Sequence, residues 1–169
     1  MNVRDPRVEA LAREHGQNLL RVAYLLTGGR ALDAEDLVQG VFATLLERGL
    51  DGVDNPLAYA RRALVNAHNS TARRAITERG VVARLPDPTG RIADRSTDAV
   101  EHRMVILPAL DTLSADERAV IVLRYYADLP DAEIADILGC ARATVRSHAH
   151  RAFATLRRGA LAHLLKEDT

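Results

Sequence analysis

The sequence is poor in the residues that crosslink or rigidify many small proteins. It has no tryptophan, 4% aromatic residues and one cysteine, Cys140, among 169 residues. A single cysteine excludes an internal disulfide and a cysteine cluster for a metal, and it fits a reducing compartment. No apolar run is long enough to span a membrane, and the charges from Arg4 onward do not fit a signal peptide. We therefore expect a cytoplasmic protein that does not enter the membrane.

Runs of valine, isoleucine, threonine and aromatic residues are also scarce, whereas alanine, leucine, arginine and glutamate are abundant. This mixture favours helices over strands. Apolar residues make up 47% of the chain, which is enough to form buried cores. A chain of this length forms one compact domain or two small ones. The composition therefore predicts an all-α protein.

The net charge is zero, but the charged residues are unevenly distributed. Residues 31–55 carry six acidic side chains and one arginine, whereas residues 56–80 carry five arginines and one glutamate. The pattern repeats, with seven acidic side chains and two arginines in 111–138, then five arginines and no acid in 139–163. Two acidic-then-basic modules indicate that each meets a cationic protein on one face and an anionic polymer on the other. Solvated helix faces with an accidental alternation of charge are the alternative at this point.

Apolar residues recur at helical spacing through the first half of the chain. Gly28 and Gly29 are a natural stop for a first helix, and Asp33 is a good N-cap for a second. Pro56 fits the first turn of a third helix. The expected elements are helices over Pro6–Leu26, about Asp33–Arg48 and Pro56–Arg79, with a loop over 49–55. Three such helices predict a small bundle.

The apolar period is lost between Val81 and about Val100, where Pro86, Pro88 and Gly90 lie close together. Connections within a compact domain usually have about 4–6 residues, so this stretch is too long for an ordinary loop. It is typical of a flexible connection between domains. The predicted organisation is a first domain over 1–80, a linker over 81–100 and a second domain over 101–169.

Helical patterns resume after the linker. Ser114 and Glu117 have the spacing of a capping box, which predicts the start of a helix that continues to Tyr126. Pro130 precedes the next helix and cannot cap it with a side chain. The remaining elements are a short helix over about Pro130–Leu138, a turn at Gly139 and a long helix over about Arg142–Leu165.

The strongest pattern for function lies in residues 131–150. A helix-turn-helix needs a small residue where its helices cross, a residue that tolerates positive φ in the turn, and an apolar anchor on the second helix. Ala135, Gly139 and Val145 occupy these three places. On the last helix, an apolar stripe around Val145 and Ala149 lies opposite a polar face rich in arginine. This face has the donors that a reader of the major groove requires, whereas an ordinary helical hairpin with a solvated basic face is the alternative.

A helix-turn-helix alone is compatible with a repressor, a response-regulator output domain, a recombinase or a sigma factor. The stretch LDTLSADERAVIVLRYYADLPDAEIADILGCARATVRSHAHRAFATLR decides between them, because it resembles the C-terminal domain of extracytoplasmic-function (ECF) sigma factors. The first half is independently similar to the sigma-factor domain that binds the polymerase clamp. The similarity lies in LLRVAYLLTGGRALDAEDLVQGVFATLLER and NPLAYARRALVNAHNSTARR, so the two matches in tandem cover residues 10–160.

The resemblance implies core RNA polymerase, through its clamp helices and its flap, and promoter DNA as partners, with an anti-sigma factor as a further expected partner. The residues that match the clamp-docking surface are Asp33, Glu35, Asp36 and Gln39. The residues that match the contacts to the downstream (minus-ten) element are Asn55 in the base-capture loop and Arg61, Arg62, Asn66, Asn69, Arg73 and Arg74 on the following helix. The residues that match the contacts to the upstream (minus-thirty-five) element are Arg142, Thr144, Arg146, Ser147, His150 and Arg151, with Arg157 at the phosphates. The residues that lie in the part that typically meets the flap are Leu113, Arg118, Val122 and Tyr126.

The chain departs from this family at one place. Relatives commonly carry tryptophan or tyrosine near residues 69–72, where this sequence has Asn69, Ser70, Thr71 and Ala72. Stacking of a base on an aromatic ring is worth about 1–3 kcal/mol, so strand opening is expected to depend on the base-capture loop and on arginine.

No nucleophile–base pair, metal-ligand cluster or phosphate-cradling loop is visible in the sequence. We therefore expect a protein that is not an enzyme and takes no cofactor, metal or small-molecule substrate. A helix-turn-helix regulator with an N-terminal interaction domain is the main alternative, and copurification with polymerase separates the two.

Overall fold

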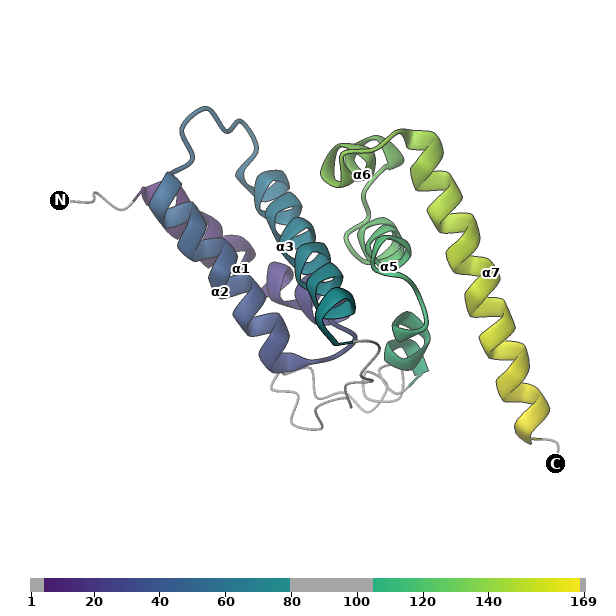
Figure 1. The fold of residues 1–169 in the computed structure, drawn as a ribbon. Coiled ribbons are helices and arrows are strands. Elements are labelled where there is room, and N and C mark those ends of the chain that lie inside the picture. Colours follow the sequence, from purple (N-terminus) through teal and green to yellow (C-terminus); the bar gives the residue numbers. More distant parts are fainter. Residues whose placement is uncertain (1–4, 80–104, 168–169) are drawn as a thin grey trace. The chain divides into compact units, whose positions relative to one another are not determined.

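The computed structural model describes residues 5–79 and 105–167, and every regular element in these ranges is a helix (Figure 1). The chain divides into two compact units, with a boundary at residues 91 and 92. The predicted linker over 81–100 lies outside the described residues. In the order of the chain, the elements are α1 Pro6–Leu26, α2 Ala31–Arg48, α3 Pro56–Arg79, a helical segment over 105–111, α5 Ala115–Ile121, the π-helical turn η1 Val122–Tyr126, α6 Asp131–Leu138 and α7 Arg142–Glu167. None of the described helices is both long and apolar enough to cross a membrane.

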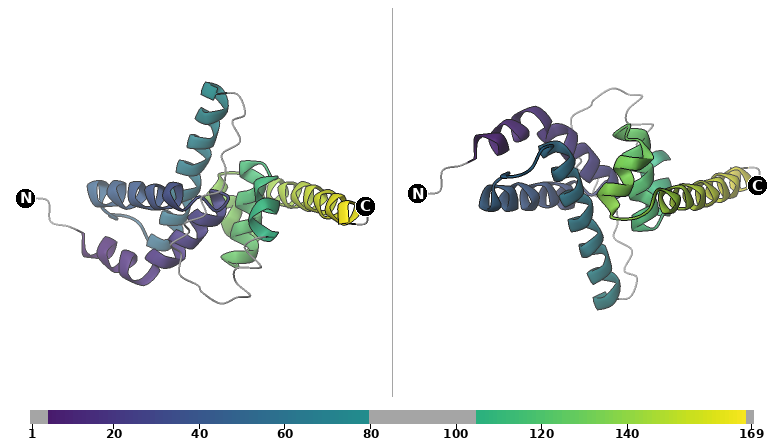
Figure 2. Two further views of the ribbon diagram at one scale, coloured as in Figure 1. Left: turned by 90° about the horizontal axis from the view of Figure 1, so that it is seen from below. Right: turned by 90° about the horizontal axis from the view of Figure 1, so that it is seen from above.

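The first unit is a bundle in which α1, α2 and α3 pack against one another. Its core is formed by the apolar stripe of each helix, and fully buried side chains include Leu19 and Leu26 from α1, Leu45 from α2 and Leu64 from α3. Burial of each such side chain is worth about 1.5–3 kcal/mol. The C-terminal part of α3 extends past the other two helices (Figure 2).

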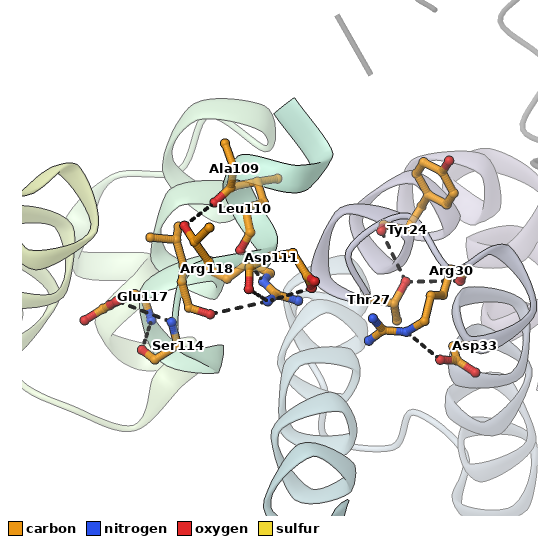
Figure 3. Close-up of polar contacts among 12 residues, drawn as sticks. Tyr24, Thr27, Arg30, Asp33, Ala109, Leu110, Asp111, Ser114, Glu117 and Arg118 are labelled. Carbon is orange, nitrogen blue, oxygen red and sulfur yellow. Dashed lines mark hydrogen bonds and ion pairs between the residues drawn. The ribbon is translucent and has the colours of Figure 1, made fainter. Parts of the chain in front are cut away.

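The start of α2 differs from the prediction. The helix begins at Ala31, its N-cap is Arg30 without a side-chain capping bond, and Asp33 lies in the first turn. The Asp33 carboxylate accepts a hydrogen bond from Nε of Arg30 at 2.8 Å (Figure 3). The prediction of Asp33 as N-cap was wrong because the α1–α2 turn is stabilised elsewhere. Gly28 and Gly29 adopt φ of 68° and 85°, and Thr27 Oγ1 lies 3.2 Å from the carbonyl oxygen of Tyr24.

The second unit is built around the helix-turn-helix. The predicted capping box is confirmed: Ser114 Oγ accepts from the amide of Glu117, and the Glu117 carboxylate accepts from the amide of Ser114, both at 3.3 Å. The core of this unit combines residues from α5 to α7, including the fully buried Val120, Ile134 and Val145. Because Pro130 has no side-chain donor or acceptor, only its backbone carbonyl contributes at the start of α6, where it accepts from the amide of Ile134 at 3.1 Å.

Arg118 is a buried polar centre of the second unit, 7% exposed (Figure 3). Its Nε donates to the carbonyl oxygen of Leu110 at 2.8 Å, and its Nη2 lies 3.3 Å from the carbonyl oxygens of Asp111 and Leu113. Nη2 also lies 3.3 Å from Oδ1 of Asp111. These carbonyls lie at or just after the C-terminal end of the segment over 105–111, where the regular helical donors run out, and the Leu110 carbonyl also accepts from the amide of Leu113 at 3.1 Å. Arg118 therefore joins this segment to α5.

The helix after the capping box does not continue as a regular α-helix to Tyr126. Residues Val122–Tyr126 form a π-helical turn, in which the amide of Ala127 donates to the carbonyl oxygen of Val122 at 3.1 Å. The wider turn accommodates one extra residue and rotates the side chains that follow it. Tyr125 consequently lies with its ring edge toward Phe153 of α7, with 5.7 Å between the ring centroids.

Candidate nucleic-acid and polymerase interfaces

The helix-turn-helix geometry follows from the three residues that the sequence singled out. Gly139 adopts φ of 64°, which ends α6 and turns the chain toward α7. The turn is closed by a hydrogen bond from the amide of Cys140 to the carbonyl oxygen of Ala135 at 3.0 Å. Ala135 is 5% exposed where the helices cross, and Val145 is fully buried. The buried faces of α6 and α7 are thereby fixed, and with them the exposed face of α7.

The exposed face of α7 carries nearly all of the residues predicted to read the upstream element. Val145, Ala149 and Ala152 occupy the buried face. Six of the predicted residues are exposed and Thr144 is half-buried; the exposed residues are Arg142, Arg146, Ser147, His150, Arg151 and Arg157. The structure therefore brings these side chains to one continuous basic surface, as groove recognition requires.

Two of these arginines also bond within the unit. Arg151 Nε donates to Glu117 Oε1 at 3.4 Å, and Arg151 Nη2 lies 2.8 Å from Nδ1 of His148. Arg157 Nε donates to the carbonyl oxygen of Phe153 at 3.3 Å. The guanidinium of Arg151 is thus held by the unit itself, whereas Arg146 extends from the exposed face at the start of the helix.

The residues predicted to contact the downstream element divide into two groups on α3. Arg62, Asn66 and Arg74 are exposed. Arg62 and Asn66 are four residues apart and share one stripe of the helix, whereas Arg74 lies eight residues beyond Asn66 and outside that stripe. Arg61 is half-buried and its Nη2 lies 3.4 Å from Oδ1 of Asn18, and Asn69 is 9% exposed. The side chain of Arg73 lies outside the described residues. The exposed stripe is therefore the better candidate for DNA contacts.

Tyr59 is a candidate that sequence reasoning missed. It precedes Arg62 by three residues and Asn66 by seven, so it lies on the same stripe of α3, and it is 37% exposed. The sequence comparison placed the expected stacking aromatic at residues 69–72, about three turns further along α3. Helical spacing from Arg62, one turn toward the N-terminus, identifies this ring.

The loop over 49–55 connects α2 to α3 and contains the predicted base-capture residue, Asn55. Its Oδ1 accepts from the amide of Ala58 at 3.0 Å, so this side chain caps the start of α3. Leu50 is fully buried and anchors the loop, whereas Asp51 and Asp54 are exposed. The loop is therefore anchored in the core by Leu50 and exposes a polar tip to solvent.

The predicted clamp-docking residues lie on α2. Asp36 and Gln39 are exposed, Glu35 is half-buried, and Asp33 is the residue paired with Arg30. Leu32 and Leu46 flank these polar residues and are 66% and 42% exposed. An acidic stripe bordered by exposed leucines suits a basic protein surface that also offers apolar contacts.

Comparison with known proteins decides which family has these two surfaces. Residues 11–76 match Sigma-70 region 2, and residues 109–158 match Sigma-70, region 4. An RNA polymerase sigma-E factor of Streptomyces avermitilis is 34% identical over 152 residues, which cover 88% of this chain and 82% of the relative. The ECF RNA polymerase sigma factor SigL of Mycobacterium tuberculosis is 35% identical over 156 residues, which cover 89% and 86%. The chain belongs to the ECF sigma factors.

Two solved structures, one of them of a sigma factor, have the same fold. The sigma factor RpoE of Bartonella quintana, solved in complex with the anti-sigma factor NepR, is 28% identical with a TM-score of 0.61. The similarity covers 90% of this chain and 92% of that chain. CnrH, solved in complex with the cytosolic domain of CnrY, has a TM-score of 0.64 over 96% of this chain and 89% of that chain, at 23% identity. This sigma factor binds core RNA polymerase and directs promoter recognition, DNA melting and the initiation of transcription.

The sigma-factor region expected to meet the polymerase flap is mostly buried here. Leu113 is 4%, Arg118 7% and Val122 2% exposed, so these three residues form the core of the second unit. Tyr126 is 39% exposed, and Tyr125, which the sequence reasoning had not selected, is 60% exposed. Buried and exposed residues alternate along this segment, and the π-helical turn changes which of them are exposed. Regular helical spacing therefore did not separate the buried residues from the exposed ones.

The described residues hold no group of three or more His, Cys, Asp or Glu side chains placed to bind a metal. Cys140 is half-buried at the turn of the helix-turn-helix. Burial raises the pKa of its thiol, and the negative charge of Asp116 raises that pKa further. A thiol with a raised pKa is a poor nucleophile, which agrees with a structural role for Cys140.

Proposed function

We propose a division of labour for this sigma factor. The first unit docks on the polymerase clamp through α2 and contacts the melted downstream element through the 49–55 loop and the exposed stripe of α3. The second unit reads the upstream element through α7. The observation that carries this assignment is the exposed face of α7, where five arginines and no acid occur in residues 139–163. Such a surface attracts phosphates and offers guanidinium groups to guanine edges.

Tyr59 modifies the proposal for strand opening. An exposed ring on the same stripe as Arg62 and Asn66 offers a stacking platform to an unpaired base. Opening then depends on the loop, on arginine and on Tyr59, rather than on aromatic residues at 69–72.

The proposed organisation is two domains, over 1–80 and 101–169, joined by a linker over 81–100. In this arrangement polymerase sets the distance between the DNA-reading surfaces. The protein acts in the cytoplasm, where polymerase is found, and has no catalytic activity of its own. An anti-sigma factor that covers the acidic face of α2 or the basic face of α7 would hold it inactive. Support comes from the structurally similar sigma factor RpoE, which was solved in complex with the anti-sigma factor NepR.

The assignment is tested by transcription in vitro with core polymerase and a promoter library randomised over both elements. We expect enriched sequences at both elements with the full chain, and no initiation without core polymerase. Enrichment at the downstream element alone would contradict the proposed role of α7. Tight binding of the free protein to the enriched duplex at physiological salt would contradict the dependence on polymerase, because non-specific binding alone is about 10⁻⁴–10⁻⁶ M.

A further inference from the structure

The loop over 49–55 is fastened to the beginning of α1 by two side chains, those of Asp5 and Arg7. Oδ2 of Asp5 accepts a hydrogen bond from the amide of Leu50 at 2.9 Å. Arg7 Nη1 donates to the carbonyl oxygen of Leu50 at 2.9 Å, and Arg7 Nη2 donates to the carbonyl oxygen of Val53. Both backbone groups of Leu50 are therefore bonded by residues more than 40 positions away in the sequence.

The rest of the loop is arranged around this attachment. Gly49 and Gly52 adopt φ of 72° and 73°, values that favour glycine, so the chain reverses on both sides of Leu50. The amide of Val53 donates to the carbonyl oxygen of Leu50 at 3.0 Å, which makes that oxygen an acceptor for both the loop and Arg7. A Cβ at Gly49 would lie 3.8 Å from Oδ2 of Asp5, so the carboxylate packs directly against the turn.

Asp5 is also the N-cap of α1, so the same side chain bonds to the loop and to the helix. Its Oδ1 accepts from the amide of Arg7 at 2.9 Å, as the N-cap of that helix. One carboxylate thus serves the first turn of α1 with one oxygen and the loop with the other. The conformation of the loop is consequently tied to the start of α1 and not only to α2 and α3.

We propose that Asp5 and Arg7 are positioning residues for the downstream promoter element, because they hold the 49–55 loop in the conformation that receives the unpaired base. The inference rests on the proposed role of this loop in base capture. A loop that is ordered before it binds loses less conformational entropy on binding. Neither side chain needs to touch DNA for this effect.

The test measures base preference with core polymerase and a library randomised at the downstream element. Arg7→Leu removes both bonds to the loop carbonyls. The amides of Arg7 and Leu50 each donate to one carboxylate oxygen of Asp5. Asp5→Asn keeps one side-chain oxygen, which can still cap α1, but leaves no second acceptor for the loop amide. We expect each variant to reduce discrimination at the captured position about tenfold, the value of one charge-assisted hydrogen bond. Arg7→Lys, which keeps a donor, should restore part of it, and Arg13→Leu, which removes an exposed arginine from the same helix, should have no effect.

Affinity for core polymerase and preference at the upstream element should remain unchanged in all these variants. A merely structural role predicts a lower melting temperature with unchanged base preference, and that result would overturn the inference. A variant with residues 51–54 replaced by glycine separates the inference from the proposed function. If this loop variant loses discrimination while Arg7→Leu and Asp5→Asn keep it, only the positioning role fails. If the loop variant also keeps it, the role of the loop itself is wrong.

Discussion

Arg151 on α7, the proposed reader helix, donates from Nε to Oε1 of Glu117, the residue that completes the capping box of α5, at 3.4 Å. The bond joins the exposed surface of the reader helix to the scaffold that supports it. Arg146, five residues earlier, is exposed on the same helix. Two arginines that look equivalent in the sequence are therefore expected to differ in what their removal does.

Arg146→Ala should relax base preference at one position of the upstream element, with a loss of about 1–3 kcal/mol at that position. Arg151→Ala should also lower the melting temperature slightly, because it removes an exposed ion pair worth under about 1 kcal/mol. Arg157→Ala should weaken all sequences alike and reduce the dependence of binding on salt. Binding of polymerase holoenzyme to a panel of upstream-element variants at several salt concentrations measures all three. Unchanged base preference in Arg146→Ala would show that the reading face lies elsewhere.

Asp36→Arg should abolish binding to core polymerase while leaving the helical content unchanged. Asp36 is exposed in the middle of the acidic stripe of α2, so reversing its charge would repel a basic partner without disturbing the core. Co-elution with core polymerase and circular dichroism are the measurements. Glu14→Arg on α1 is the matched control, because it makes the same charge change at an exposed position of the same unit. Equal loss of binding in both variants would point to net charge rather than to docking through α2.

Tyr59→Ala should slow promoter opening on duplex templates, and Tyr59→Phe should not. The expected loss is about 1–3 kcal/mol, or roughly 5- to 150-fold, the range for stacking of one base. Permanganate reactivity of unpaired thymines measures opening. A template with a pre-melted downstream element should rescue Tyr59→Ala if the ring acts in opening. Equal defects in the alanine and phenylalanine variants would assign the effect to the hydroxyl group instead.

Arg118→Met should destabilise the second unit by about 2–4 kcal/mol, because it leaves several buried carbonyl oxygens without their charged donor. The first unit should be unaffected. Amide hydrogen exchange, followed separately in residues 5–79 and 105–158, distinguishes the two. Arg158→Met removes an exposed arginine from the same unit and should change its stability by no more than about 0.5 kcal/mol. Similar protection in both variants would show that the Arg118 bonds contribute little.

Asp5 makes the stability of the first unit depend on pH in the acid range. Hydrogen bonds from the amides of Arg7 and Leu50 lower the pKa of its carboxyl group in the folded state. The unfolded chain therefore takes up the proton first, near its ordinary pKa of about 3.9. The contribution is fully present above that pH and is lost as the pH falls through the folded-state pKa. Urea unfolding of the native chain and of Asp5→Asn should show a stability difference that shrinks below about pH 4. A difference that is independent of pH would contradict the role of the charged carboxylate.

Many features of the fold could be predicted from the sequence because they depend on residues that are close together in the chain. The helices over Pro6–Leu26 and Pro56–Arg79 have the predicted bounds, and the capping box at Ser114 and the left-handed turn at Gly139 are confirmed. Each of these features depends on residues within a few positions of one another. The same holds for the basic face of α7, since helical periodicity alone separates it from the buried stripe around Val145.

The features that were not predicted depend on contacts that residue type and helical periodicity do not reveal. Nothing near Asp5 indicates that it bonds to the amide of Leu50, 45 positions away. Arg118 carries a charge that usually places a side chain at the surface, and its hydrogen bonds to carbonyl oxygens of the preceding segment accompany its burial. Asp33 is a good capping residue by type, but the α1–α2 turn starts the helix at Ala31 instead. The capping bond from the amide of Ala58 to Oδ1 of Asn55 was not predicted either, and the assignment of Asn55 to base capture stays a prediction.

The bonds between Arg118 and the preceding carbonyls also limit where this chain can be joined to another protein. A chimera that exchanges the DNA-reading half of one sigma factor for that of another needs a junction, and the capping box at Ser114 is an obvious choice by sequence. A junction there would replace Leu110, Asp111 and Leu113, whose carbonyl oxygens accept from the guanidinium group, by residues of the other protein. The buried cation would then depend on a segment that did not fold around it, and poorly placed acceptors would cost several kcal/mol. A hybrid that begins before residue 105 keeps these acceptors and is the one expected to fold.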